Sequence, residues 1–253
     1  MKVDKFRTVI IYIIIILLGL VCLLPLLNIV AISFSSSAAV EGNMVGLIPV
    51  GFSTAAYEKI LEDSQFWHSF LISVERVVLT LIINFVLIVL MAYPLSKTNA
   101  QFRGRNIYAN LMIFAMLFNG GMIPTFLLVK SYGLLNTVWA LVLPGAVPIF
   151  NVILVMNFFA AVPKELEEAA FIDGANPLQV LTKIFIPISK PVLATVSLFS
   201  IVGSWNDFYS GLIYMSKAAY YPLMTYIQSL QINVEDLIKQ GNLSAVVDSA
   251  SLG

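Results

Sequence analysis

The sequence is poor in charge, in cysteine and in histidine. Asp, Glu, Lys and Arg make up only 11% of its 253 residues, whereas a soluble domain carries about 25%. The single cysteine, Cys22, excludes an intrachain disulfide and a cysteine-ligated metal site. His68 is the only histidine and has no partner ligands, so the sequence predicts no metal site. The 14 basic and 14 acidic residues cancel, so the net charge does not indicate a nucleic-acid partner.

The sequence patterns of common enzymes are also missing. There is no GxSxG nucleophile motif, no HExxH zinc motif and no phosphate-binding P-loop. An intramembrane enzyme is one alternative. It needs two converging acid or nucleophile groups within apolar segments, and only Asp207 approaches such a position. The sequence therefore favours a protein that is not itself an enzyme.

Long apolar runs dominate the chain. Hydrophobic residues make up 59% of it, and the mean hydropathy is +0.92. A helix that crosses a bilayer needs about 20 mainly apolar residues, and five segments reach this length. We therefore predict an all-α integral membrane protein, a polytopic helical bundle. Its spans are expected at approximately 9–32, 70–93, 107–129, 137–160 and 191–214.

The basic residues predict how these spans are oriented. With the N-terminus in the cytoplasm, nine Lys and Arg residues fall in cytoplasmic segments and five fall outside. Cytoplasmic loops carry an excess of Lys and Arg, so this orientation is preferred. The opposite orientation would place the cluster around Arg103 and Arg105 outside.

This topology divides the chain into four parts. Residues 1–33 hold the N-terminal tail and the first span, and residues 34–69 form an extracytoplasmic segment. Residues 70–216 form a core with spans two to five, which includes a cytoplasmic loop at 161–190. Residues 217–253 are more polar and are expected to be extracytoplasmic.

The most distinctive segment is EAAFIDGANPLQVLTKIFIP, from Glu168 to Pro187. It predicts two short helices, of which the first covers 164–172 and carries carboxylates in its first turn. The spacing predicts that one face of this helix carries a set of four side chains, namely Leu166, Ala169, Ala170 and Asp173. Gly174 then suits the left-handed conformation that ends a helix.

Asn176 is expected to cap the second helix, with Pro177 at its first position and Gln179 completing a capping box. The spacing places four apolar side chains on one face of this helix, namely Leu178, Leu181, Phe185 and Ile188. On these features alone, an amphipathic hairpin that lies on the membrane surface and binds nothing is an equal alternative.

The motif decides between these alternatives. Its pattern is Glu-Ala-Ala, a Gly six positions after the Glu, nine residues, and then Ile-x-aliphatic-Pro. This pattern resembles the EAA loop of ATP-binding-cassette importer permeases, through which such permeases engage their ATPase subunits. Further stretches are similar to carbohydrate permeases of the maltose-permease type, above all to the lipoprotein-type sugar permeases of Gram-positive bacteria. These stretches include FRGRN, FNGGMIPTFLLVKSYGLLNTVWALVLPG and LFSIVGSWNDFYSGLIYM, and the similarity runs from about Phe66 to about Tyr226.

The resemblance implies a permease subunit that moves an oligosaccharide or sugar derivative into the cytoplasm of a bacterial cell. Its expected partners are a second homologous permease, two ATPase subunits, an extracytoplasmic sugar-binding protein and the lipid bilayer. This chain is expected to bind no cofactor, while ATP and Mg are used by the ATPase subunits. Permeases of this family usually have six spans. Either the chain is truncated before a sixth span expected beyond Gly253, which we favour, or it departs from the family.

Within the motif, the residues expected to dock the ATPase are Glu168, Ala169, Ala170, Asp173 and Gly174. Polar residues at the middle of spans are expected to face the bundle interior, and they predict a polar, neutral path. The candidates are Asn84, Asn119, Asn151, Trp205 and Asn206. The bland alternative is that these groups only bond or pack neighbouring helices. A permease for an amino acid or peptide, or a passive channel, is the alternative function.

Overall fold

The computed structural model describes residues 5–118 and 120–239. In this part of the chain all regular secondary structure is helical, which confirms the predicted all-α class. The chain forms two compact units, one of residues 1–66 with 234–253 and one of residues 67–233. Each unit is described by itself.

The first unit contains α1 (Lys5–Ser33), α2 (Ser37–Glu41) and α3 (Ala55–Glu62). From Thr8 to Ser33, α1 is long and apolar enough to cross a membrane. Its large apolar side chains are exposed, as expected for a helix whose solvent is lipid. Asn28 near its end donates to the carbonyl oxygens of Val45 and Gly46, at 3.3 and 2.6 Å. These bonds tie the segment after α2 to α1.

The second unit is built on α4 (Ser64–Leu95), the other helix that is long and apolar enough to cross a membrane alone. Its buried face changes character along its length. The first half of this face is polar, with Ser69, Ser73, Arg76, Thr80 and Asn84 buried, and the second half is apolar, with Ile88, Val89, Ala92 and Leu95 buried. The spacing of three and four residues places each set on one side of the helix.

The next helices of this unit are shorter, and breaks in the helical structure separate them. They are α5 (Arg105–Leu117), α6 (Met122–Ser131), α7 (Val138–Val142) and α8 (Ile149–Ala160). A 3-10 turn at Leu143–Gly145 separates α7 from α8, and the pair bends by 47°. Pro144 and Pro148 lie at this bend, and proline lacks the N–H that a continuous helix needs. Within residues 5–118 and 120–239, α1, α4 and three bent helix pairs are long and apolar enough to give up to five membrane crossings, the number that the sequence predicted.

The predicted fifth span, 191–214, is wrong as a continuous helix. The structure has α12 (Lys190–Asn206), an extended residue at Asp207, and then α13 (Tyr209–Tyr214). The main-chain oxygen of Asp207 accepts from Arg76, and its carboxylate accepts from the N–H of Ser210. These tertiary and local bonds replace the helical ones. A further helix that was not predicted from the sequence, α14 (Leu223–Lys239), follows a 3-10 turn at Ala218–Tyr220.

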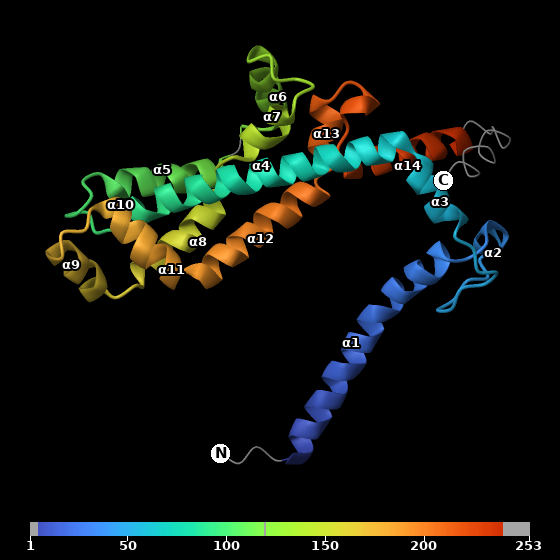
Figure 1. Ribbon diagram of the computed structural model, residues 1–253, viewed down its shortest axis with the longest axis horizontal. Helices are drawn as coiled ribbons and strands as arrows, with labels where there is room; N and C mark the ends of the chain where they lie inside the picture. Colours follow the sequence, from blue (N-terminus) through green and yellow to red (C-terminus); the bar gives the residue numbers. More distant parts are fainter. Residues whose placement is uncertain (1–4, 119, 240–253) are drawn as a thin grey trace. The chain divides into compact units, whose positions relative to one another are not determined.

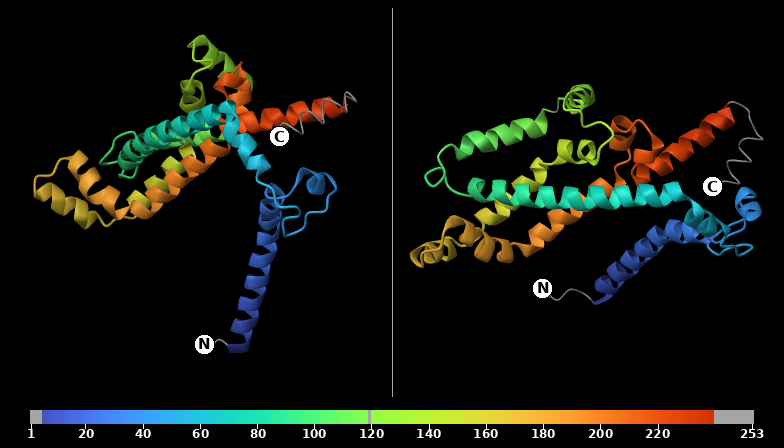
Figure 2. Two further views of the ribbon diagram at one scale, coloured as in Figure 1. Left: turned by 45° about the vertical axis from the view of Figure 1, so that its right-hand side comes forward. Right: turned by 45° about the horizontal axis from the view of Figure 1, so that its top comes forward.

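In the second unit, α4, α8 and α12 run alongside one another (Figures 1 and 2). Their apolar core includes Ile88, Ala92, Val152, Val155, Phe159, Leu193 and Val196. At one end of these helices lies a hairpin of α9 (Lys164–Ile172), α10 (Pro177–Val180), a π-helical turn at Leu181–Phe185 and α11 (Ile186–Ile188). At the other end of α8 and α12, beside the middle of α4, lie α7 and α13, which contact each other. The hairpin corresponds to the distinctive segment of the sequence.

Candidate functional site

The first helix of the hairpin, α9, has the bounds that the sequence predicted, 164–172. Glu168, Ala169 and Asp173 are exposed, and Ala170 is half-buried against the core. Leu166 and Ile172 are also exposed, Ile172 by 87%. The face that carries the motif therefore points away from the bundle, and it is open to another protein.

Glu167 is the one buried residue of α9. Lys97, two positions after the end of α4, lies 2.7 Å from its carboxylate, and the two side chains are only 12% and 11% exposed. The Lys97 ammonium also lies over the rings of Tyr93 and Phe185, at 4.1 Å from each centroid. Burial lowers the pKa of Lys97 from its usual range, although Glu167 acts in the opposite direction. This pair holds α9 against the end of α4.

The corner of the hairpin follows the sequence prediction. Gly174 has φ +81°, the left-handed conformation. The side chain of Asn176 accepts from the N–H of Gln179 at 2.9 Å, and the Gln179 side chain accepts from the N–H of Asn176 at 2.9 Å. Pro177 is the first helical residue. The predicted capping box is therefore confirmed, and it fixes the start of the second helix.

The predicted apolar face of the second helix is only half right. Leu181 and Phe185 are buried, but Leu178 and Ile188 are 62% and 42% exposed. The π-helical turn at Leu181–Phe185 accounts for Ile188, because a π turn changes the angular spacing of the residues that follow it. Val180 is fully buried instead.

A polar cavity of about 280 Å³ lies among α4, α7, α8, α12 and α13. Two of the predicted pathway residues, Asn84 and Asn151, line it and are both buried. Asn84 donates to the hydroxyl of Ser200 at 3.1 Å, which joins α4 to α12. The other polar residues in the lining are Arg76, Thr80, Ser204, Asp207 and Ser210. The bundle therefore contains a polar interior that its sequence predicted only in part.

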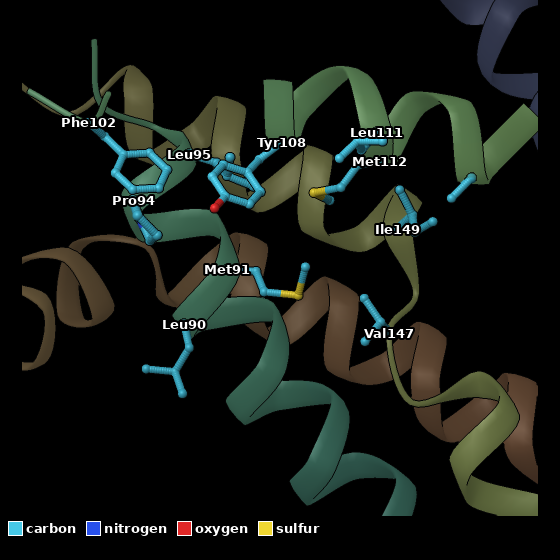
Figure 3. A pocket seen from close by; sticks show the side chains of 11 residues that line it. Leu90, Met91, Pro94, Leu95, Phe102, Tyr108, Leu111, Met112, Val147 and Ile149 are labelled. Atoms are coloured by element: carbon cyan, nitrogen blue, oxygen red, sulfur yellow. The ribbon is translucent and has the colours of Figure 1, made fainter. Parts of the chain in front are cut away.

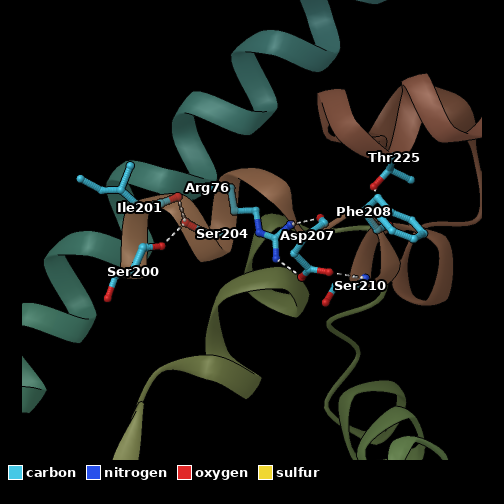
Figure 4. Close-up of polar contacts among 8 residues, drawn as sticks. All are labelled: Arg76, Ser200, Ile201, Ser204, Asp207, Phe208, Ser210 and Thr225. Atoms are coloured by element: carbon cyan, nitrogen blue, oxygen red, sulfur yellow. Dashed lines mark hydrogen bonds and ion pairs between the residues drawn. The ribbon is translucent and has the colours of Figure 1, made fainter. Parts of the chain in front are cut away.

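An ion pair lies in the lining of this cavity (Figure 4). Arg76 donates to the carboxylate of Asp207 at 2.5 Å and to its main-chain oxygen at 2.9 Å. Arg76 is 3% exposed and lies on the inner face of α4, whereas its sequence neighbour Glu75 is exposed and does not face it. The net charge of the cavity lining is zero.

Three buried polar atoms of the lining have no hydrogen-bond partner, namely Arg76 Nε, Thr80 Oγ1 and Asn84 Oδ1. They lie at intervals of four residues along α4, so they form a row on one face of that helix. A buried polar atom without a partner costs about 1–3 kcal/mol. These atoms leave unused hydrogen-bonding capacity on the face of α4 that lines the cavity.

The remaining pathway candidates lie elsewhere. Trp205 is half-buried and packs edge-on against Phe70, with ring centroids 6.0 Å apart. Asn206 is exposed and donates to the carbonyl of Val202 in its own helix. Neither residue lines the polar cavity. Asn119 lies outside the described residues.

An apolar hollow of about 430 Å³ lies between α4, α5 and the start of α8 (Figure 3). Its lining includes Leu90, Met91, Leu111, Met112, Val147 and Ile149. Nearly all of this surface is hydrocarbon, so it does not suit a solute that carries hydroxyl groups. The polar cavity is the better candidate for a solute path.

Sequence reasoning missed Lys97, Glu167, Arg76 and Thr80 as site residues. The partners of Lys97 and Arg76 lie 70 and 131 positions away, and a single sequence carries no signal for such pairings. One signal was available for Arg76 and Thr80. Arg76, Thr80 and Asn84 follow one another at intervals of four residues in an apolar helix, and this spacing places all three on one face.

Together, the apolar helices, the polar interior and the exposed hairpin define a multi-pass membrane transport subunit. The comparisons with known proteins place it more closely. Residues 76–247 match the family model described as binding-protein-dependent transport system inner membrane component, and the chain belongs to this family. It is therefore the permease component of an ATP-binding-cassette importer, and it acts with an ATPase and a substrate-binding protein.

Relatives and a solved structure agree with this placement. The chain is 42% identical to Protein LplC of Bacillus subtilis over 214 residues, which cover 85% of this chain and 72% of that protein. It is 39% identical to the polygalacturonan/rhamnogalacturonan transport system permease protein YtcP of the same organism, over 95% of this chain and 83% of that protein. A chain from the crystal structure of a bacterial ABC transporter that imports the acidic polysaccharide alginate matches with TM-score 0.83 and 32% identity. That match covers 100% of this chain and 92% of the other.

Proposed function

We propose that this permease carries a saccharide into the cytoplasm, driven by ATPase subunits that dock on the exposed face of α9. The observation that carries this proposal is that the two sides of α9 differ in burial. Glu167 is buried against α4, whereas Glu168, Ala169 and Asp173 are exposed. An amphipathic hairpin on a membrane surface separates its apolar and charged side chains onto opposite faces, but here Leu166 and Ala169 are exposed together with Glu168 and Asp173.

The side chains of the proposed docking face have distinct roles. The exposed Glu168 carboxylate offers a charge contact to a basic side chain of an ATPase. Ala169 has a small side chain that allows close approach of the partner surface. Gly174, with its positive φ, sets the angle between α9 and α10. ATP and Mg are bound by the ATPase subunits rather than by this chain.

The saccharide class is supported by the relatives and by the cavity. By their names, relatives belong to transport systems for polygalacturonan or rhamnogalacturonan and for diacetylchitobiose, and the structural neighbour is involved in the import of alginate. In this chain the cavity offers hydroxyl, amide and guanidinium groups, with no net charge in the lining. Such groups suit the hydroxyls of a sugar. A permease for an amino acid or a peptide is the alternative.

The remaining components follow from the same proposal. A second homologous permease completes the bundle, two ATPase subunits dock beneath it, and an extracytoplasmic sugar-binding protein delivers the saccharide. The N-terminus and the hairpin lie in the cytoplasm, as the distribution of basic residues indicates.

The first test is Ala169→Trp, which places a large ring on the docking face. The importer is purified through this chain, and bound ATPase is measured. Growth of a deletion strain is measured on neutral and acidic oligosaccharides and on dipeptides. We expect the wild-type chain to recover ATPase and to restore growth on at least one oligosaccharide, and the variant to do neither while keeping its thermal stability. Ala100→Trp, on another exposed loop, is the control and should behave as wild type.

Two results would count against this proposal. Full ATPase recovery and growth with Ala169→Trp would show that this face does not dock the ATPase. Restoration of growth on dipeptides but on no oligosaccharide would favour the peptide alternative.

A further inference from the structure

The end of α4 is fastened to both halves of the hairpin by one side chain. Lys97 lies two positions after the end of α4, and its N–H donates to the carbonyl of Pro94 in the last turn of that helix at 3.3 Å. Its ammonium contacts Glu167 on α9 and the ring of Phe185 in the π-helical turn. A movement of either half of the hairpin therefore acts on the same group.

The contacts around Lys97 form a closed set. Tyr93, one turn earlier on α4, donates its hydroxyl to Glu167 at 3.4 Å. The Tyr93 and Phe185 rings meet edge to face, with centroids 5.1 Å apart. Phe185 is 2% exposed and also packs on Phe159 of α8, with centroids 5.4 Å apart. These rings leave Lys97 little freedom to follow the hairpin without moving α4.

Stability alone is a poor reason for this ion pair. Removing two charges from water costs free energy, and a pair of apolar side chains of similar volume is often as stable or more so. An ion pair with two hydrogen-bonded oxygens is, however, directional, and it fixes the relative position of the two helices. The geometry thus indicates that the Lys97–Glu167 pair fixes the position of α9 relative to the end of α4 rather than adding to the stability of the fold.

Adjacent carboxylates on α9 point in different directions. Successive residues of an α-helix are about 100° apart around its axis, so Glu167 faces α4 while Glu168 faces outward. The proposed ATPase contact and the contact with α4 are therefore one residue apart on a single short helix. A rotation or shift of α9 that Glu168 receives is passed directly to Glu167.

The other half of α4 carries the polar cavity. Lys97 and Arg76 are separated by 21 positions, or about 31 Å along a helix, and α4 is continuous from Ser64 to Leu95. Thr80 and Asn84 lie on the same helix within the cavity lining. A displacement at Lys97 therefore acts on the end of the same helix whose first half lines the cavity.

We propose that Lys97 and Glu167 are positioning residues that transmit the movement of the docked hairpin to α4 and so to the polar cavity. This inference rests on the proposed function, since it needs an ATPase on α9. It assigns the pair a role after docking, in coupling, and no role in holding the ATPase itself.

The experiment uses the whole importer, purified through this chain and placed in proteoliposomes. A reporter cysteine, Gly203→Cys, is introduced with Cys22→Ser. Gly203 lines the cavity, and a Cβ there meets no atom within 4 Å. The rate of reaction of this cysteine with a maleimide is measured without nucleotide and with ATP plus orthovanadate. In the wild-type background we expect nucleotide to change this rate.

In Lys97→Met and in Glu167→Gln we expect this nucleotide-dependent change to fall by about fivefold or more. The ATPase should still co-purify, and ATP hydrolysis should continue. Lys97→Arg keeps the charge and should retain most of the change. The matched controls are Glu165→Gln on the exposed side of α9 and Lys190→Met at the start of α12, and both should respond as wild type.

Three other outcomes would contradict either this inference or the proposed function. If Lys97→Met and Glu167→Gln keep the full nucleotide-dependent change, the pair does not couple the hairpin to the cavity. If these variants lose the ATPase, the pair maintains the docking surface, and the inference is equally overturned. If the wild-type importer carries no ATPase, the proposed function itself fails, which is a different result.

Discussion

At the scale of the residue, the charges of this apolar protein matter most where they are buried. Arg76 with Asp207 and Lys97 with Glu167 form two ion pairs, and each joins α4 to a distant segment. Removing one partner of a buried pair leaves an uncompensated charge, which costs more than removing both. The two pairs should therefore tolerate double substitution better than single substitution.

This reasoning gives a prediction for Arg76 and Asp207. Arg76→Met should lower the free energy of unfolding by about 2 kcal/mol, less than the 3–5 kcal/mol of a fully buried pair, because the Asp207 side chain is 29% exposed. Arg76→Met with Asp207→Asn should recover at least half of this loss. Thermal unfolding of the purified importer in detergent measures both. Equal or additive losses in the double variant would contradict the assignment.

The pairing of Arg76 also shows what a single sequence cannot predict. Glu75 is its neighbour in the sequence, but successive residues of a helix do not face each other. The true partner lies 131 positions away, and only the packing of α12 on α4 brings it close. Asn84 and Asn151 could be predicted as interior residues, because a polar group in an apolar span has a strong reason to avoid lipid.

At the scale of the element, local signals predicted well and tertiary ones did not. The bounds of α9, the left-handed Gly174 and the capping box of Asn176 all depend on residues within four positions of one another. The end of α12 at Asn206 depends instead on Arg76, which no local pattern reveals. The π-helical turn at Leu181–Phe185 was missed because a regular helix was assumed.

A close contact between α13 and α14 gives a second prediction. A Cβ on Gly211 would lie 2.8 Å from both Cβ and Cγ2 of Thr225, and Thr225 is held in place by a hydrogen bond to the Phe208 carbonyl at 2.8 Å. Gly211→Ala should therefore destabilise the protein by about 1–3 kcal/mol through overpacking. The measurement is thermal unfolding in detergent.

The control for this prediction is Gly203→Ala in α12, where an added Cβ meets no atom within 4 Å. This change should be neutral or slightly stabilising, since alanine favours a helix over glycine by about 1 kcal/mol. If Gly211→Ala is as stable as Gly203→Ala, the contact between α13 and α14 is looser than described.

At the scale of the whole molecule, the second unit places the polar cavity and the hairpin at different parts of α4. The polar cavity lies along its first half, and the hairpin is fastened beyond its second half. The sequence predicted the fold class and the hairpin, since both depend on composition and a local motif. It did not predict that one helix connects them, because this follows from which faces pack.

The orientation of the chain gives a third prediction. In a Cys22→Ser background, Ala100→Cys between α4 and α5 should react with a membrane-impermeant maleimide only after the cells are opened. Ala56→Cys in α3 should react in intact cells. Both positions are exposed, and the excess of Lys and Arg near the first of them favours the cytoplasm. The reverse pattern of labelling would invert the proposed topology.

The π-helical turn has a consequence for how this protein can change over evolution. The contact between the Phe185 ring and the Lys97 ammonium depends on the number of residues between Gly174 and the π-helical turn, because this number sets the direction in which Phe185 points. Insertion or deletion of one residue would rotate everything beyond it by about 100°, and the ring would leave the ammonium. Thr182 and Lys183 are exposed, so their identities are free to drift. In this segment, descendants of the chain can vary in composition while their length stays constant.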